Sequence, residues 1–283
     1  MAVIESVRIQ AGGLAFRARA AGPADGRLVV LLHGFPQTSA EWLAQLDALG
    51  DAGFRAVAFD QRGYSPGARP AEESAYDRDA LVGDVLAVAD ALGAAGAGFD
   101  LVGHDWGGAI AWQVAGLHPA RVRSLGVVST PHPDAMSAAA RDGRSDQRER
   151  SSYMDLFRTR GTAEETLLAD DAAYLRAAYQ GLPEASVAEY LDVLREPGAL
   201  TGALNWYRAI TPKSLHDAGR IAAPTLYVWG ADDAALSRAA AERTAEHVAG
   251  PYRFVALPGV GHWVPEQGAD ALNTALLEHL AAH

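Results

Sequence analysis

The segment GHDWGG (residues 103–108) holds the side chain best placed for covalent chemistry. It follows the apolar run Phe99–Val102 and precedes residues with helical spacing. A sharp turn between a strand and a helix forces an unfavourable backbone at its apex, so glycines flank the apex two positions away on each side. Gly103 and Gly107 flank Asp105 in this way. We therefore predict that Asp105 is a nucleophile, at a position that serine occupies more often.

Asp233 and His262 are the candidate acid and base for this nucleophile. Asp233 follows the strand-like sequence YVW, and His262 lies in the glycine-rich sequence GVGHW after the last apolar run, which sets it apart from the other histidines. The order Asp105, Asp233, His262 is the order of nucleophile, acid and base in enzymes with such a turn. Asp232 competes for the role of the acid, but the spacing Gly-x-x-Asp favours Asp233.

Short apolar runs along the chain predict the strands that would position these residues. The runs are Val7–Gln10, Leu14–Ala20, Leu28–Leu32, Ala56–Phe59, Phe99–Val102, Leu125–Val128, Thr225–Trp229 and Arg253–Ala256. The first two are separated by Ala11-Gly12-Gly13 and indicate an antiparallel hairpin. A helical pattern over Arg78–Leu92 lies between later runs. This alternation predicts an α/β fold with a mostly parallel sheet and helices on both faces.

One long stretch interrupts the alternation. Residues 133–216 contain no strand-like run, and Glu164–Tyr179 and Ser186–Leu194 have the pattern of amphipathic helices. We predict a helical cap (lid) domain over residues 133–216, above the carboxyl ends of the strands, with residues 1–132 and 217–283 forming the core domain. An independent helical domain is the alternative.

Composition narrows the class of protein. The chain has 283 residues, 24 basic and 35 acidic side chains, a formal charge of −11 and no cysteine. This charge disfavours nucleic acid and anionic lipid as partners, and the lack of cysteine excludes disulfides and thiolate metal sites. The sequence has no apolar run of about 18 residues, no signal-peptide pattern and no cofactor or metal motif. We expect a cytoplasmic protein that uses neither cofactor nor metal; its oligomeric state is not readable.

The sequence resembles the aspartate-nucleophile branch of the α/β-hydrolase superfamily, and within that branch the epoxide hydrolases. The resemblance is carried by HGFP (residues 33–36), GHDWGG (103–108), LNWYR (204–208) and GHW (261–263), and it extends over about residues 28–283. It implies the α/β-hydrolase fold, with an eight-stranded sheet. It also implies hydrolysis of a small, apolar epoxide with water as the second substrate.

The resemblance assigns roles to two backbone amides and two tyrosines. The amides of Phe35 and Trp106 would form the oxyanion hole, although HGFP alone is also compatible with a simple turn. Tyr207 matches one of the two family tyrosines that hold the epoxide oxygen, because it lies in NWYR. Tyr153 matches the other by its position only. All four residues would also contact the substrate. Tyrosines that compete with Tyr153 are Tyr174, Tyr179 and Tyr190.

A carboxylate nucleophile restricts the reaction. Its attack on a carbonyl carbon would give a reactive anhydride, whereas its attack on a saturated carbon gives an ordinary alkyl ester. Asp105 therefore indicates displacement at carbon, followed by hydrolysis of the ester with His262 as base and Asp233 orienting the imidazole. We expect Asp105 to be ionised and His262 neutral in the free enzyme, so that activity falls at acid pH.

Other functions use the same residues. Haloalkane dehalogenases resemble this chain at Trp106 but usually have asparagine at the position of Phe35, and fluoroacetate dehalogenases have arginines at the positions of Trp106 and Ala109. An epoxide leaves as a basic alkoxide and needs phenol donors, which favours epoxide hydrolysis over dehalogenation of a haloalkane or haloacid. A biosynthetic ring-opening cyclase and a ligand-binding protein with this fold stay open as alternatives.

Overall fold

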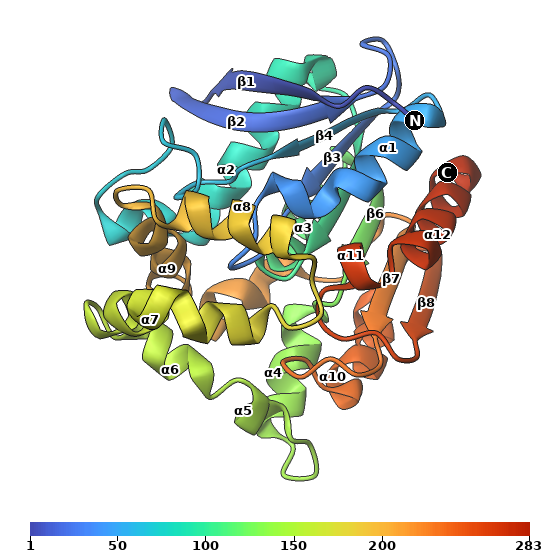
Figure 1. Ribbon diagram of the computed structural model, residues 1–283. Helices are drawn as coiled ribbons and strands as arrows, with labels where there is room; N and C mark the ends of the chain where they lie inside the picture. The colour runs from blue at the N-terminus through green and yellow to red at the C-terminus, as the bar shows by residue number, and fades with distance from the viewer.

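The protein folds around one eight-stranded sheet (Figure 1). The computed structural model describes the backbone of residues 1–283 and all side chains except those of Pro212 and Asp217. The strands are β1 (Glu5–Ala11), β2 (Leu14–Ala21), β3 (Leu28–Leu32), β4 (Arg55–Phe59), β5 (Phe99–His104), β6 (Val122–Val128), β7 (Thr225–Gly230) and β8 (Tyr252–Leu257), in the spatial order β1-β2-β4-β3-β5-β6-β7-β8. Strands β1 and β2 pair antiparallel, as do β2 and β4, and all other neighbours are parallel. The predicted fold is confirmed.

The central strands are buried on both faces, which explains their uninterrupted apolar sequences. In β3, Val29 and Leu31 belong to one apolar cluster, whereas Val30 and Leu32 belong to another on the opposite face. Helices α1 (Leu43–Asp51) and α12 (Ala269–Ala282) pack together on the first face, and α2 (Arg78–Ala89) and α3 (Trp106–Leu117) pack on the second. The carboxyl ends of the parallel strands β5, β7 and β8 lie at the same edge of this packed sheet, with β6 between β5 and β7.

The other helical elements connect the strands or form the long segment between β6 and β7. They are η1 (Ser39–Trp42), η2 (Glu73–Tyr76), η3 (Asp90–Ala94), α4 (Pro133–Arg141), α5 (Gln147–Arg150), α6 (Tyr153–Arg158), α7 (Thr162–Ala178), α8 (Glu184–Leu194), α9 (Ala199–Ala209), η4 (Pro212–Ala218), α10 (Arg238–Arg243), η5 (Thr244–His247) and α11 (Val264–Gln267). Within the part of the chain that the structure describes, no helix is long and apolar enough to cross a membrane.

Residues 133–216, called the helical segment from here on, contain α4–α9 and no strand (Figure 1). A third apolar cluster packs α6–α9 together and against Phe35 and Trp263 of the neighbouring loops. The helix predicted over Glu164–Tyr179 corresponds to α7, but the prediction is wrong in its middle: Ala169 has an extended backbone and Asp170, Asp171 and Ala172 have positive φ. The division into core and cap domains stays a prediction.

Candidate active site

Asp105 lies at the turn between β5 and α3, with a strained backbone. Its φ of 49° and ψ of −120° fall outside the regions that residues with a side chain favour. The flanking glycines permit the tight turn: a Cβ on Gly103 would lie 2.3 Å from the Gly107 carbonyl oxygen, and one on Gly107 would lie 2.2 Å from the Leu32 carbonyl oxygen. The packing of β3, β5 and α3 thus holds the Asp105 side chain at the carboxyl end of the sheet.

The three residues predicted to work together meet at this end of the sheet. Asp105 follows β5, Asp233 follows β7 and His262 follows β8. His262 Nδ1 lies 2.8 Å from Asp233 Oδ2, and His262 Nε2 lies 3.5 Å from Asp105 Oδ2. The imidazole therefore links the two carboxylates through its two nitrogens.

Asp233, and not Asp232, is the residue next to the imidazole. Its other oxygen, Oδ1, accepts hydrogen bonds from the backbone N–H groups of Ala235 at 2.8 Å and Leu236 at 2.9 Å. These two hydrogen bonds to Oδ1 leave Oδ2 free for His262, and when the ring is neutral Oδ2 keeps the hydrogen on Nδ1. Asp232, by contrast, is exposed.

The protonation state of His262 differs from the sequence-based expectation. Burial lowers its pKa, but the charges of Asp233 and Asp105 and the hydrogen bonds to them outweigh burial and raise the pKa to about 10. For Asp105 burial raises the pKa, yet the hydrogen bond and charge of His262 bring the pKa below its ordinary value. The free site thus holds a carboxylate beside an imidazolium at neutral pH, so the expectation of a neutral His262 in the free enzyme is wrong.

The backbone amide of Phe35 binds the nucleophile candidate directly. Its N–H donates a hydrogen bond to Asp105 Oδ1 at 2.8 Å. Trp106 follows Asp105 and begins α3, so its amide lies at the positive end of that helix. Because Phe35 holds Oδ1 and His262 faces Oδ2, the two carboxylate oxygens have different surroundings.

Tyr153 and Tyr207 lie across from Asp105, on the helical segment. Tyr153 begins α6 and lines a cavity of about 500 Å³ together with Asp105 and Trp106. Tyr207, in α9, is 2% exposed, and its ring lies 5.0 Å from the Trp106 ring and 5.3 Å from the Phe35 ring. It is not among the residues that line the cavity as the structure describes it. Burial and then the charge of Asp105 raise the pKa of Tyr153, and burial and then Tyr153 raise that of Tyr207, so both phenols stay protonated.

The competing tyrosines lie in other surroundings. Tyr179 donates its hydroxyl hydrogen to the Pro36 carbonyl at 2.6 Å, and Tyr190 donates to Glu266 Oε1 at 2.9 Å. Tyr174 is 40% exposed. None of the three lines the cavity. Position therefore favours Tyr153 as the second tyrosine beside the nucleophile candidate.

The cavity has a mixed apolar and polar lining. Besides Asp105 and Tyr153, its polar lining residues are Thr130, Ser137, Arg148, Ser151, Ser152, Asp155, Arg158 and Thr211. Its apolar lining residues are Ala109, Pro131, Pro133, Met136, Ala140, Met154, Ile210, Leu215 and Leu236. These come from the core and from the helical segment, so the cavity lies where the two meet. Such a site suits a small molecule that has apolar parts and a reactive group that faces Asp105.

Two buried residues beside the site were not predicted from the sequence. His104, which lies in GHDWGG, and Glu41, in η1, are both fully buried, and His104 Nδ1 lies 3.3 Å from Glu41 Oε2. His104 Nε2 lies 3.0 Å from the backbone carbonyl oxygen of His262. The motif could have indicated His104, but nothing in the spacing points to Glu41.

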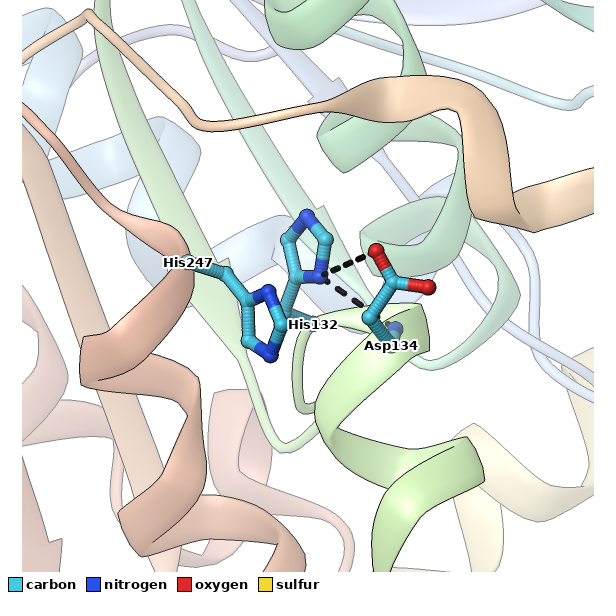
Figure 2. Close-up of side chains that lie close together, drawn as sticks. All are labelled: His132, Asp134 and His247. Carbon is cyan, nitrogen blue, oxygen red and sulfur yellow. Dashed lines mark hydrogen bonds and ion pairs between the residues drawn. The ribbon is translucent and has the colours of Figure 1, made fainter.

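Among the side chains that the structure describes, one group of potential metal ligands lies outside this site. Ligand-type atoms of His132, Asp134 and His247 lie within 4.8 Å of one another (Figure 2). The two imidazole rings stack, with centroids 4.5 Å apart and planes 4° from parallel. An imidazole nitrogen binds a metal in the plane of its ring, and one ion cannot lie in two stacked planes. His132 Nδ1 instead accepts the N–H of Asp134 at 3.3 Å and caps α4, which is a structural role.

Together, this fold and this arrangement of residues are those of an α/β hydrolase with an aspartate at the sharp turn between β5 and α3. A family model of the alpha/beta hydrolase fold matches residues 27–269, and the chain belongs to that family.

Individual relatives agree with this assignment. The chain is 33% identical to epoxide hydrolase A of Mycobacterium tuberculosis and 33% identical to the AB hydrolase superfamily protein YfhM of Bacillus subtilis, with 96% of both chains covered in each case. It superposes on the crystal structure of epoxide hydrolase A from Mycobacterium thermoresistibile with a TM-score of 0.86 at 29% identity, over 99% of this chain and 98% of the other. The chain is thus an α/β hydrolase that is similar to epoxide hydrolases.

Proposed function

We propose that the protein hydrolyses an apolar epoxide to a vicinal diol through an ester on Asp105. The observation that carries the proposal is the arrangement at the cavity: Asp105 on the sheet side and the phenol of Tyr153 on the helical side both line it, and the buried ring of Tyr207 packs against Trp106, another lining residue. A carboxylate attacks saturated carbon, and a phenol supplies the proton that an alkoxide leaving group needs. The helical segment acts as a cap that carries these phenols.

In the first step, Asp105 Oδ2 attacks an epoxide carbon. The new bond joins Oδ2 to this carbon, the bond from the carbon to the epoxide oxygen breaks, and that oxygen takes a proton from Tyr153 or Tyr207. Oδ1 stays bound to the Phe35 N–H and becomes the carbonyl oxygen of the ester. Because Phe35 holds Oδ1, Oδ2 is the oxygen available for attack.

In the second step, water attacks the Cγ carbon of the ester while His262 Nε2 takes a proton from it. Negative charge develops on Oδ1, which the Phe35 and Trp106 amides stabilise. The intermediate then collapses, the bond between Cγ and Oδ2 breaks, and Oδ2 leaves with the diol after it receives a proton from His262. The original Oδ2 is thereby lost to the product, and Asp105 gains an oxygen from water. The proton on the rebuilt carboxyl group passes to His262, which returns the pair to the ionised state of the free site.

Formation of the ester also prepares His262 for its role as base. In the free site the Asp105 charge is one of the interactions that raise the pKa of His262. The ester is neutral, so that interaction disappears, the pKa of His262 falls and the imidazolium releases its proton, which restores the phenol that protonated the epoxide oxygen. Asp233 stays ionised and continues to orient the ring.

The test is a single turnover in ¹⁸O-labelled water with enzyme in excess over styrene oxide. The covalent route predicts label in the peptide that contains Asp105 and an unlabelled first diol. In a matched experiment, His262→Gln should accumulate an adduct on that peptide, visible by intact mass. Label in the first diol, with no adduct in the variant, would show that water attacks the epoxide directly. A haloalkane and p-nitrophenyl acetate, assayed in parallel, test the alternative activities.

A further inference from the structure

We propose that Glu41, in its protonated form, is a positioning residue for His262 and acts through His104. The inference rests on the proposed function, because it concerns the step in which His262 activates water. The contacts of the backbone carbonyl of His262 are its starting point.

This carbonyl is held by several donors. It accepts hydrogen bonds from Ser129 Oγ at 2.9 Å and from the Val264 N–H at 2.9 Å, and His104 Nε2 lies 3.0 Å from the same oxygen. A carbonyl oxygen can only accept, so Nε2 of His104 must carry a hydrogen. The contact thus fixes the tautomer of His104 and ties the loop of His262 to β5.

The tautomer in turn decides the state of Glu41. A neutral His104 with a hydrogen on Nε2 has a lone pair on Nδ1, and Nδ1 lies 3.3 Å from Glu41 Oε2. Two acceptors do not bind each other, so the hydrogen between them must belong to Glu41. Oε1 of Glu41 has no well-aligned hydrogen-bond partner among the described residues, as expected for a carboxyl group that donates through one oxygen only.

The electrostatics agree with a neutral pair. Burial and then the charge of His262 lower the pKa of His104 to about 4. Burial and then the charge of Asp105 raise the pKa of Glu41 well above its ordinary value, although the nearby Gly34 amide offsets part of this change. An ionised Glu41 would place a second negative charge near Asp105, and among these groups its only basic neighbours would be His104 and His262.

Several other titratable groups face the pair, and the test must take account of them. They are Asp105, Asp233 and His262 of the site, His33, Glu266, and the phenols of Tyr64, Tyr179 and Tyr190. A change in the charge of Glu41 would therefore alter the pH dependence of the reaction, whereas a change in packing alone would not.

The experiment compares Glu41→Met with the matched variant Glu41→Gln in single turnovers of styrene oxide. Methionine removes the hydrogen-bond donor, so His262 loses part of its positioning, and hydrolysis of the ester should slow by roughly 10–100-fold with little change in ester formation. Glutamine keeps a donor toward His104 Nδ1 and cannot ionise. Glu41→Gln should therefore restore both the rate of ester hydrolysis and the pH profile of the wild type.

Each other outcome overturns the inference. Equal slowing of ester hydrolysis in both variants, or a shifted pH profile in Glu41→Gln, would mean that the charge of the Glu41 carboxylate matters. A normal rate of ester hydrolysis in Glu41→Met would mean that Glu41 does not position His262. Should Glu41→Met not fold, ¹⁵N NMR of the wild-type imidazoles still tests the tautomer: His104 should stay neutral, with hydrogen on Nε2, between about pH 5 and 8. Absence of any ester in the wild type would instead refute the proposed function itself.

Discussion

On the sheet side of the cavity, Asp105, Asp233 and His262 are fixed by hydrogen bonds to backbone groups and to one another, whereas on the helical side Tyr153 and Tyr207 are fixed by ring packing. Asp233 accepts two backbone N–H groups, and Asp105 accepts one. The rings of Tyr153 and Tyr207 each lie 5.1 Å from the ring of Phe157.

This difference suits the work that we assign to each side. Charged groups need directional contacts because a small misplacement changes both pKa and proton transfer. Phenols that donate one proton need mainly burial, which keeps them protonated, and aromatic packing supplies it. Substitutions on the sheet side should therefore nearly abolish one step of the reaction, whereas substitutions on the helical side should reduce the rate only in part.

The largest expected effect concerns the neighbouring residues Asp233 and Asp232. Asp233→Asn should slow hydrolysis of the ester by up to about 10⁴-fold. In one orientation the side-chain NH₂ would face the two backbone N–H groups that now donate to Oδ1, and in the other it would donate to His262 and favour the wrong tautomer. Asp232→Asn is the control and should behave as the wild type, since Asp232 is exposed. Stopped-flow measurement of both steps checks this. Equal effects of the two changes would mean that Asp233 does not orient the base.

Removal of the phenol groups is expected to have the next largest effect. Tyr153→Phe and Tyr207→Phe should each slow ester formation by roughly 10²–10⁴-fold if both protonate the alkoxide, and less if they share donation. The double variant should be slower than either single variant. Rates of ester formation with styrene oxide under single-turnover conditions provide the measurement.

Tyr174→Phe is the matched control for this series. Tyr174 lies on the same helical segment but is 40% exposed and does not line the cavity. A rate loss in Tyr174→Phe together with a silent Tyr153→Phe would show that Tyr153 is not the proton donor.

The pH dependence should differ between the two steps. Ester hydrolysis needs neutral His262, and the pKa of His262 in the ester must lie below its value of about 10 in the free site, because the Asp105 charge has gone. Hydrolysis should therefore slow by about tenfold per pH unit below that pKa. Ester formation should vary less, since the pKa of Asp105 is lowered and the carboxylate persists. The measurement is the rate of each step as a function of pH. A pH dependence of ester formation alone would contradict the expectation.

Much of the sheet could be predicted because its sequence signals are local. An apolar run such as Leu28–Leu32 and the glycines around Asp105 define a buried strand and a sharp turn without knowledge of the rest of the fold. The Gly-x-x-Asp spacing likewise selected Asp233, which the structure places beside His262. The roles of these residues stay predictions.

The remaining features depend on contacts that no local pattern encodes. The break in α7 at Ala169–Ala172 interrupts a continuous helical pattern, so sequence spacing could not show it. Glu41 and His104 are 63 positions apart and become partners only through tertiary packing. The raised pKa of His262 similarly results from two carboxylates brought to one ring by different strands.

The smallest expected effect tests whether ring packing positions the phenols. Phe157 contacts the rings of Phe35, Tyr153 and Tyr207 at centroid distances of 5.1–5.2 Å, and it is 4% exposed. Phe157→Leu should cost about 1 kcal/mol of stability, since leucine fills most of the space but loses the ring contacts. It should also slow ester formation several-fold because the phenols can shift. Phe254→Leu is the control: its partly buried ring stacks on the buried ring of Tyr227, with 5.3 Å between centroids. It should lower the melting temperature similarly without a change in either step. If both variants lowered stability alike and neither slowed ester formation, burial rather than ring geometry would position Tyr153 and Tyr207.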